Sequence, residues 1–317
     1  MSKHLDVVTF GEPMAMFYAN EEGPLDEVMS FSKALAGAES NVATGLSRLE
    51  HTVGYVTKLG EDSFGSFIFK ALNKEGIDTS NISFSREFPT GMLIKSKVAS
   101  GDPKVEYFRR HSAASKLGLA DFDASYFASA GHLHVTGISS AISPECHEFS
   151  VHAMEFMKQS GKTVSFDPNL RPALWPGAKT MADTINNLAT RCDWFIPGLG
   201  EGRILTGLTA PEEIAAYYLN LGVSLVVIKL GPEGAYYKSS DLEGYVQGFK
   251  VDQVVDTVGA GDGFAVGVIS GLLEKLPLKE AVRRGNAIGA LAVMSPGDRD
   301  GLPTREQLER FISQVTH

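Results

Sequence analysis

The feature that most limits how this chain can fold is an alternation of short apolar segments with amphipathic ones. Residues 5–10 (LDVVTF) and 53–60 (VGYVTKLG) read as buried strands, whereas residues 63–76 carry the apolar spacing of a helix. The same rhythm returns through residues 130–231. Alternating strands and helices favour βαβ units, a mostly parallel sheet and helices on both faces. We therefore expect residues 1–317 to form one α/β domain.

Two parts of the sequence interrupt this alternation. Residues 12–36 and 88–112 contain strand-like stretches with no helix between them. We expect these segments to form a second, small sheet that covers a binding site as a lid or pairs with another subunit. The C-terminal part is almost entirely helical, with helices predicted over residues 260–275, 278–294 and 304–315.

The composition argues against several classes of protein. Of the 317 residues, 43% are hydrophobic and the formal net charge is −9, so the surface repels nucleic acids and other polyanions. No apolar run approaches the roughly eighteen residues of a membrane span. The two cysteines, Cys146 and Cys192, lack the spacing of a disulfide framework or a metal site. We expect a cytoplasmic protein that binds neither nucleic acid nor membrane.

Several local patterns suggest other functions but lack the residues those functions need. The stretch SGKTVSF has Phe156 where a P-loop requires its first glycine, and HEFSVH has Val151 where a zinc-protease helix requires histidine. His132 and His134 alternate on a predicted strand without metal ligands spaced to match. The late GAGDG does not follow the first strand, so a dinucleotide site is not expected.

The stretch DTVGAGDGF, residues 256–264, combines flexible backbone with a carboxylate at the start of an apolar helix. Gly259, Ala260 and Gly261 precede a first turn that contains Asp262. Unsatisfied N–H groups at a helix N-terminus can close on an anion such as a phosphoryl group. Asp262 could accept the proton of an attacking hydroxyl, as phosphoryl transfer requires. The alternative is a glycine-rich turn capped by an aspartate.

This turn resembles the C-terminal signature of the ribokinase-like, or PfkB, carbohydrate kinases. Residues 36–65 (AGAESNVATGLSRLEHTVGYVTKLGEDSFG) resemble their N-terminal signature, and the resemblance covers essentially the whole chain. It implies a ribokinase-like three-layer sandwich with a mostly parallel central sheet and a small β lid. It also implies ATP-dependent, magnesium-dependent phosphorylation of a sugar hydroxyl. Because relatives with such a lid pair it between two subunits, we expect a homodimer.

The resemblance assigns roles to individual residues where the motifs match. It makes Asp262 the catalytic base and the amides of Gly259, Ala260 and Gly261 the anion hole. On the sugar side it places three residues of the AGAESN segment, which are Gly37, Ala38 and Asn41. On the ATP side it places Lys229, Gly231 and Gly234 of the KLGPEG segment, and Asn286 near the adenine. For Asn286 the alternative is a polar residue on a surface helix.

One departure from the family pattern concerns magnesium. The family commonly has the sequence N-x-x-E for organising magnesium and phosphate, whereas this chain reads PGLGEG, with Gly198 in place of asparagine and Glu201 retained. Magnesium prefers oxygen ligands and keeps several waters. We therefore expect Glu201 to act through a magnesium-bound water and assign no role to residue 198.

Within the family, two segments resemble the kinases that act on 2-keto-3-deoxygluconate. These are residues 107–117 (YFRRHSAASKL) and 166–176 (FDPNLRPALWP). An acid sugar favours arginine, whose planar guanidinium can bind both carboxylate oxygens. The resemblance puts Arg109 and Arg171 on the substrate carboxylate, with Tyr107 beside them.

Other interpretations remain open at this point. Arg171 could be a loop arginine paired with Asp167, and Arg109 could lie on a solvated strand edge. The substrate could be fructose or the sugar of another PfkB kinase. A non-catalytic sensor of sugar acids is a further alternative, although a sensor needs no base such as Asp262.

Overall fold

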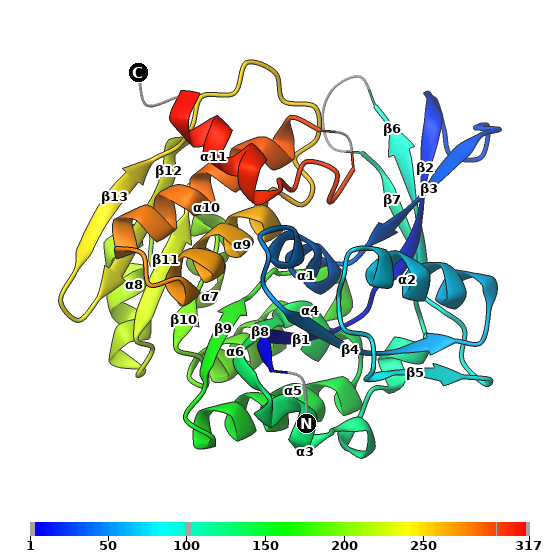
Figure 1. Cartoon of the computed structure of the whole chain (residues 1–317), viewed down its shortest axis with the longest axis horizontal. Coiled ribbons are helices and arrows are strands. Elements are labelled where there is room, and N and C mark those ends of the chain that lie inside the picture. The colour runs from blue at the N-terminus through cyan, green and yellow to red at the C-terminus, as the bar shows by residue number, and fades with distance from the viewer. Residues whose placement is uncertain (1–3, 99–102, 296, 315–317) are drawn as a thin grey trace.

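The chain is described by a computed structural model over residues 4–98, 103–295 and 297–314, so residues 99–102 of the expected lid lie outside the described residues. Its main element is a nine-stranded sheet with β9 in the middle (Figure 1). From β11 to β5 every neighbouring pair of strands is parallel, whereas β12 runs antiparallel to both of its neighbours, β11 and β13. In spatial order the strands are β13 (Glu243–Gln247), β12 (Gly234–Ser239), β11 (Leu225–Lys229), β10 (Trp194–Phe195), β9 (Thr163–Asp167), β8 (Ala130–Thr136), β1 (Leu5–Phe10), β4 (Val53–Gly60) and β5 (Ile82–Ser85).

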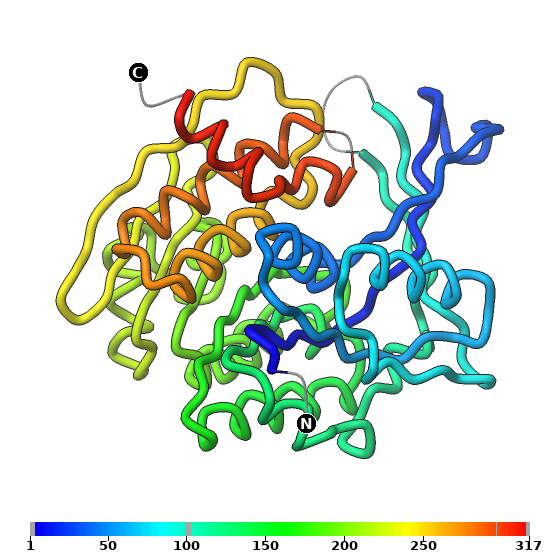
Figure 2. The backbone as a smooth tube through the Cα atoms, in the orientation of Figure 1, coloured from blue at the N-terminus to red at the C-terminus, as the bar shows by residue number. Residues whose placement is uncertain are grey.

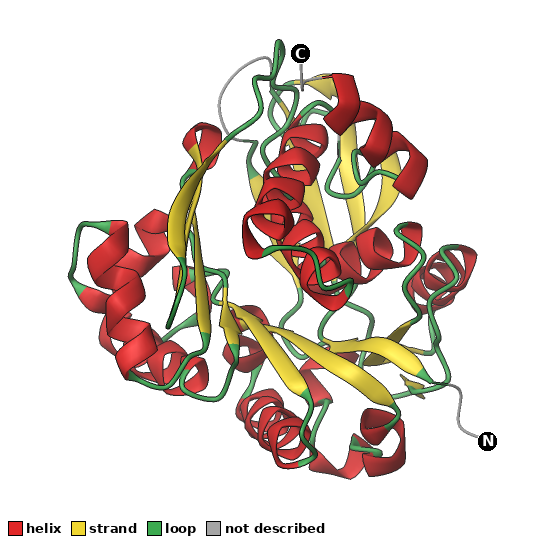
Figure 3. Ribbon diagram, turned by 60° about the vertical axis from the view of Figure 1, so that its left-hand side comes forward, coloured by secondary structure: helices red, strands yellow, loops and turns green. Residues whose placement is uncertain are grey.

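Both faces of this sheet are buried because successive side chains of a strand point in opposite directions. In β11, Leu225 and Val227 join one apolar cluster while Val226 and Ile228 join another. Figure 3 shows the helices on both sides of the sheet. The expected α/β architecture with helices on both faces is confirmed.

The helices divide between these two clusters. One cluster receives α1 (Ala38–Arg48), α2 (Ser63–Lys74), α9 (Ala260–Leu273), α10 (Leu278–Val293) and α11 (Arg305–Gln314). The other receives α3 (Ala124–Ala128), α4 (Gly137–Ile142), α5 (Pro144–Gln159), α6 (Ala178–Ala189), α7 (Leu199–Thr206) and α8 (Pro211–Asn220). In the part of the chain that the structure describes, none of the helices could span a membrane by its length and hydropathy.

Local chemistry explains where several elements begin and end. The carboxylate of Asp62 accepts the backbone N–H groups of Phe64 and Gly65, which starts α2. Gly76 follows the end of α2 with φ of 78°, the left-handed conformation that commonly ends a helix. Strand β10 is short, because only Trp194–Phe195 pair before Pro197.

The hairpin of β12 and β13 was not predicted from the sequence. Its strands are antiparallel at one edge of an otherwise parallel sheet, with Ala235 opposite Val246 and Tyr236 opposite Tyr245. The stretch was overlooked because it lacks the strand–helix rhythm of the preceding units. It matters for function because the turn that enters β12 borders the cavity described below.

A second sheet stands beside α1 and α2 (Figure 1). Its strands are β3 (Phe31–Ala36), β2 (Met14–Glu22), β6 (Met92–Lys97) and β7 (Val105–Phe108), in that spatial order. They fall within the two segments expected to form a small sheet. Figure 2 shows these segments, far apart in the chain, running side by side. Phe17 of β2 meets Phe64 of α2 edge to face at 5.5 Å, so α2 supports this sheet.

The core makes a direct prediction about stability. Phe149 of α5 is fully buried and its ring lies 4.9 Å from that of Phe10. We expect Phe149→Ala to lower the free energy of unfolding by about 3–5 kcal/mol in urea denaturation, because it removes apolar contacts and leaves a cavity. The control Leu242→Ala, at a side chain that is 57% exposed, should change stability by less than about 0.5 kcal/mol. Equal effects of the two substitutions would contradict this packing.

Candidate active site

Asp262 lies where the first turns of α1 and α9 meet. Nδ2 of Asn41 donates a hydrogen bond to Oδ2 of Asp262 over 2.8 Å. Nδ2 of Asn169, in the loop after β9, donates to Oδ1 over 3.3 Å. The side chain of Asp262 is buried, so both of its oxygens are held by amides rather than by bulk water. The expected sugar-side residue Asn41 and the expected base are thus brought into contact.

The environment of Asp262 suits a proton acceptor near neutral pH. Burial, the largest cause, raises the pKa of its carboxyl to about 7, and the negative charge of Asp167 acts in the same direction. The hydrogen bond from Asn41 and the positive charges of Lys229 and Arg171 lower this pKa and so limit the rise. The carboxylate can therefore take up a proton at a pH where most aspartates remain ionised.

The glycine turn before Asp262 has a conformation that requires glycine at its first position. Gly259 caps α9 with φ of 81°, and a Cβ atom there would lie 2.1 Å from the carbonyl oxygen of Asp298. Ala260 and Gly261 open the helix and line a cavity. A Cβ atom on Gly261 would lie 3.5 Å from Nζ of Lys229, so a positive charge stands close to the exposed helix end.

Lys229 is held by a buried ion pair that joins the carboxyl ends of β11 and β9, on either side of β10. Its Nζ donates to Oδ2 of Asp167 over 2.6 Å. Burial lowers the pKa of Lys229, but the carboxylates of Asp167, Glu201 and Asp262 raise it more in sum, so the lysine stays charged. Among the described residues Asp167 forms its ion pair with Lys229, whereas Arg171 donates to the carbonyl oxygen of Leu170.

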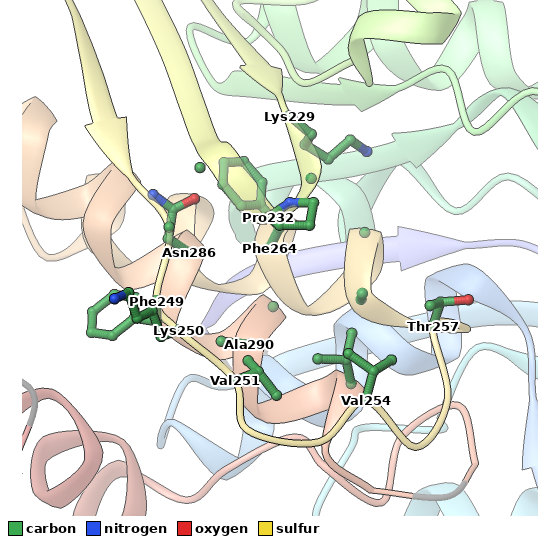
Figure 4. A pocket seen from close by; sticks show the side chains of 17 residues that line it. Lys229, Pro232, Phe249, Lys250, Val251, Val254, Thr257, Phe264, Asn286 and Ala290 are labelled. Atoms are coloured by element: carbon green, nitrogen blue, oxygen red, sulfur yellow. The ribbon is translucent and has the colours of Figure 1, made fainter.

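The cavity beside the turn has a volume of about 460 Å³, and every residue expected on the ATP side lines it. Figure 4 shows Lys229 and Thr257 at one end of the cavity and Phe249 and Asn286 at the other. The cavity is also lined by Gly231 and Gly234 at the turn before β12, and by Ala260 and Gly261 at the start of α9. A phosphate chain fits the charged end, and a flat apolar ring fits the other.

Asn286 is not the polar residue of a surface helix that was considered from the sequence. It is 7% exposed, and its Nδ2 donates to the carbonyl oxygens of Val246 and Gln247 over 3.0 Å each. These bonds fix α10 to β13 and orient the Asn286 amide at the edge of the cavity.

At the start of α1, Gly37 and Ala38 bring the backbone close to the small sheet. Gly37 has φ of 125°, and a Cβ atom there would lie 2.7 Å from the carbonyl oxygen of Glu12. Ala38 is the first residue of α1, three positions before Asn41. The position where a sugar was expected therefore lies between α1 and the beginning of the small sheet.

The two arginines expected on a substrate carboxylate have different surroundings. The guanidinium of Arg109 pairs with the carboxylate of Glu12 at 2.5 Å, and its side chain is only 10% exposed, so Arg109 is not on a solvated strand edge. The Ser112 hydroxyl donates to the same carboxylate. Arg171 is exposed, and its Nη1 donates to the carbonyl oxygen of Leu170 over 3.0 Å. Tyr107 is 49% exposed, with its ring 5.8 Å from the Arg109 guanidinium.

Glu201 organises two loops of the site. Its Oε2 accepts the backbone N–H of Gly198 over 2.6 Å, and its Oε1 accepts that of Leu170 over 2.8 Å. Each oxygen keeps a lone pair that can accept a bond from a metal-bound water, so the residue fits the expected indirect role. Within residues 4–98, 103–295 and 297–314, no group of three His, Cys, Asp or Glu side chains could by itself hold a metal.

Two residues of the site were missed by the sequence interpretation. Asn169 follows β9 and Glu12 follows β1, both at the carboxyl ends of parallel strands where ligands collect in such sheets. The rule points to both positions, but neither residue was assigned a role from the sequence. Their pairing with Asp262 and Arg109 could not have been found from spacing, because 93 and 97 positions separate the partners.

The family of the chain follows from comparison with known proteins. The sequence profile of the pfkB family carbohydrate kinases matches residues 4–305. The chain belongs to the pfkB family. It is 60% identical to the 2-dehydro-3-deoxygluconokinase of Bacillus subtilis (strain 168), covering 98% of this chain and 96% of that protein. It is 32% identical to Fructokinase-1 of Oryza sativa subsp. japonica, covering 98% of each.

A solved structure gives the same result for this pfkB carbohydrate kinase. A protein described as a ribokinase II from E. coli, in complex with ATP and Mg²⁺, superimposes with a TM-score of 0.91 at 28% identity, covering 98% of this chain and 99% of that one. The predictions of the family, the ribokinase-like fold and the enzyme class are confirmed. Carbohydrate kinases are phosphotransferases that act on sugar hydroxyls, and this is the class of the chain.

The environment of Asp262 predicts the pH dependence of this pfkB kinase. The base must be deprotonated to act, so kcat/KM should fall about tenfold for each pH unit below about 7. Asn41→Ala removes a hydrogen bond that lowers the pKa, so the acid limb should move to higher pH. Asn169→Ala removes the longer bond and should move the limb less. A limb that stays near pH 4 in the wild type would exclude Asp262 as the base.

Proposed function

We propose that this chain transfers the γ-phosphoryl group of ATP to 2-keto-3-deoxygluconate, also called 2-dehydro-3-deoxygluconate, giving the 6-phosphate. The observation that carries the proposal is the buried Asp262 carboxylate, which has a raised pKa and directly follows the Gly259–Gly261 turn. The 60% identity to a protein named for this activity supports the choice of sugar.

In this mechanism some residues orient the catalytic base and others transfer the proton or stabilise charge. Asp262, oriented by Asn41 and Asn169, takes the proton from the attacking hydroxyl. The backbone amides of the Gly259–Gly261 turn and the ammonium of Lys229 stabilise negative charge on the transferred group. Bound magnesium would neutralise further phosphate charge, and Glu201 would accept a hydrogen bond from one of its waters.

We place the substrates on opposite sides of this turn. ATP occupies the 460 Å³ cavity, with its phosphates toward Lys229, the β12 turn glycines Gly231 and Gly234 beside it, and its adenine toward Asn286. The sugar lies against Gly37, Ala38 and Asn41. The whole chain acts as one kinase domain, with the small sheet as the lid of the sugar site.

The carboxylate of the sugar acid binds at the two arginines. Arg171 is exposed beside the base, since its charge lowers the pKa of Asp262. Arg109 is held in place by Glu12, so it loses little side-chain freedom when it binds a substrate. Tyr107, next to Arg109, completes this part of the site.

We also propose that the protein is a cytoplasmic homodimer joined through the small sheet. Tyr107 and Phe108 of β7 are 49% and 53% exposed, which leaves apolar area on this sheet for a second copy. The oligomeric state in solution, measured by sedimentation, tests this part independently of activity.

The first test is turnover of ATP to ADP in the presence of magnesium with different sugars. We expect the highest kcat/KM with 2-keto-3-deoxygluconate, compared with gluconate, fructose and ribose. Asp262→Asn should bind both substrates while kcat falls by a factor of about 10² to 10⁴. A preference for fructose would favour the fructokinase alternative. Tight binding of a sugar acid with no turnover would favour the sensor.

The second test concerns the charge of the substrate. Arg171→Met should raise KM for the keto-deoxy acid by roughly ten- to a hundred-fold, because a hydrogen bond to a charged group contributes about 1.5–3 kcal/mol. KM for a neutral sugar should change little. Arg86→Met, at a side chain that is 87% exposed and paired with Glu61, is the matched control. Equal loss on acid and neutral sugars would remove Arg171 from the carboxylate site.

A further inference from the structure

A buried lysine of the small sheet reaches into the structure around the anion-hole turn. Lys95 lies in β6, where it pairs with Tyr18 of β2 on one side and Val105 of β7 on the other. Its side chain is only 8% exposed. Lysine is rarely buried to this extent unless its charge is paired.

The ammonium of Lys95 bridges two carboxylates from distant parts of the chain. Nζ lies 2.6 Å from Oδ2 of Asp256 and 3.4 Å from Oδ1 of Asp298. Both carboxylates are also largely buried, at 13% and 11% exposed. Asp256 lies before α9 and Asp298 after α10, so one cation joins the small sheet to both segments.

Both partners of Lys95 contact the Gly259–Gly261 turn or the residue before it. Oδ1 of Asp256 accepts the backbone N–H of Val258 over 3.0 Å, immediately before Gly259. The carbonyl oxygen of Asp298 lies so close to Gly259 that no Cβ atom fits between them. A movement of either aspartate, through the Asp256 carboxylate or the Asp298 backbone, would therefore move the turn.

We propose that Lys95 is a positioning residue for phosphoryl transfer: its ammonium holds the anion-hole turn in place through Asp256 and Asp298 and ties it to the lid. This inference rests on the proposed role of the turn, though not on the identity of the sugar. Arg109 follows the neighbouring strand β7, so closure of the lid on a sugar and the geometry of the turn are mechanically linked through β6 and β7.

Electrostatics explains why the cation is needed at this place. Burial raises the pKa of Asp298, and the nearby Asp256 raises it further, while Lys95 lowers it. Without Lys95 two buried like charges would face each other, and they would separate or take up a proton. A small free cation that enters the vacated space would restore the attraction.

The experiment compares Lys95→Met with Lys97→Met, measured with ATP, magnesium and the sugar that the wild type turns over. Lys97 lies in the same strand, but it is exposed and donates only to the carbonyl oxygen of Asn20. We expect Lys95→Met to lower kcat by about a hundred-fold, as for a misplaced catalytic group, with little change in either KM. Ammonium chloride, replacing tetramethylammonium chloride at constant ionic strength, should restore most of the lost kcat. Lys97→Met and the wild type should not respond.

Either of two results with Lys95→Met would overturn the inference. One is a wild-type kcat in Lys95→Met, and the other is a lost kcat that ammonium does not raise although circular dichroism shows folded protein. If Lys95→Met does not fold, Lys95→Met/Asp298→Asn keeps the net charge of the cluster and must also show a low kcat. A wild-type kcat in that variant would equally overturn the proposal. Absence of turnover in the wild type would instead contradict the proposed function.

Discussion

Burial of the Asp262 carboxylate is the constraint on which the arrangement around the site depends. A charge removed from water must find hydrogen bonds, and here Asn41 and Asn169 supply them as neutral amides. A lysine paired directly with Asp262 would lower the pKa of the Asp262 carboxyl and make the carboxylate a poor base. Lys229 instead pairs with Asp167 and influences the Asp262 carboxyl only through its charge.

The same principle of buried, paired charges connects segments that are far apart in the chain. Glu12 after β1 holds Arg109 after β7, and Lys95 in β6 holds Asp256 before α9. Buried pairs of this kind add little net stability, but breaking one is unfavourable. Their effect is to fix loops that would otherwise be free to move. The two pairs link the small sheet to the start of α1 and to the start of α9, which are the two sides of the candidate site.

Much of the fold could be predicted because its strands and helices follow from the local hydrophobic periodicity of the sequence. Periodicity located six strands of the large sheet, which are β1, β4, β8, β9, β10 and β11, and the last three helices, and the interruption of that rhythm located the small sheet. The short edge strand β5 was not predicted. The hairpin of β12 and β13 was missed because it departs from the βαβ rhythm. In the site, the two signature motifs named Asp262, the glycine turn and Asn41. The partners of these residues escaped notice, since contacts across 93 or more positions leave no trace in spacing.

The sequence by itself determined the kind of chemistry, because the glycines before Asp262 and the arginines of the two substrate-like segments are local choices of residue type. It also determined the class of fold, because hydrophobic periodicity is set residue by residue. Only the tertiary structure decided the pKa of Asp262, which depends on burial beneath α1 and on the charges of Asp167, Lys229 and Arg171. It likewise decided that Arg109 is anchored while Arg171 is exposed. Desolvation and ion pairing depend on which distant segments pack together, and no local pattern specifies them.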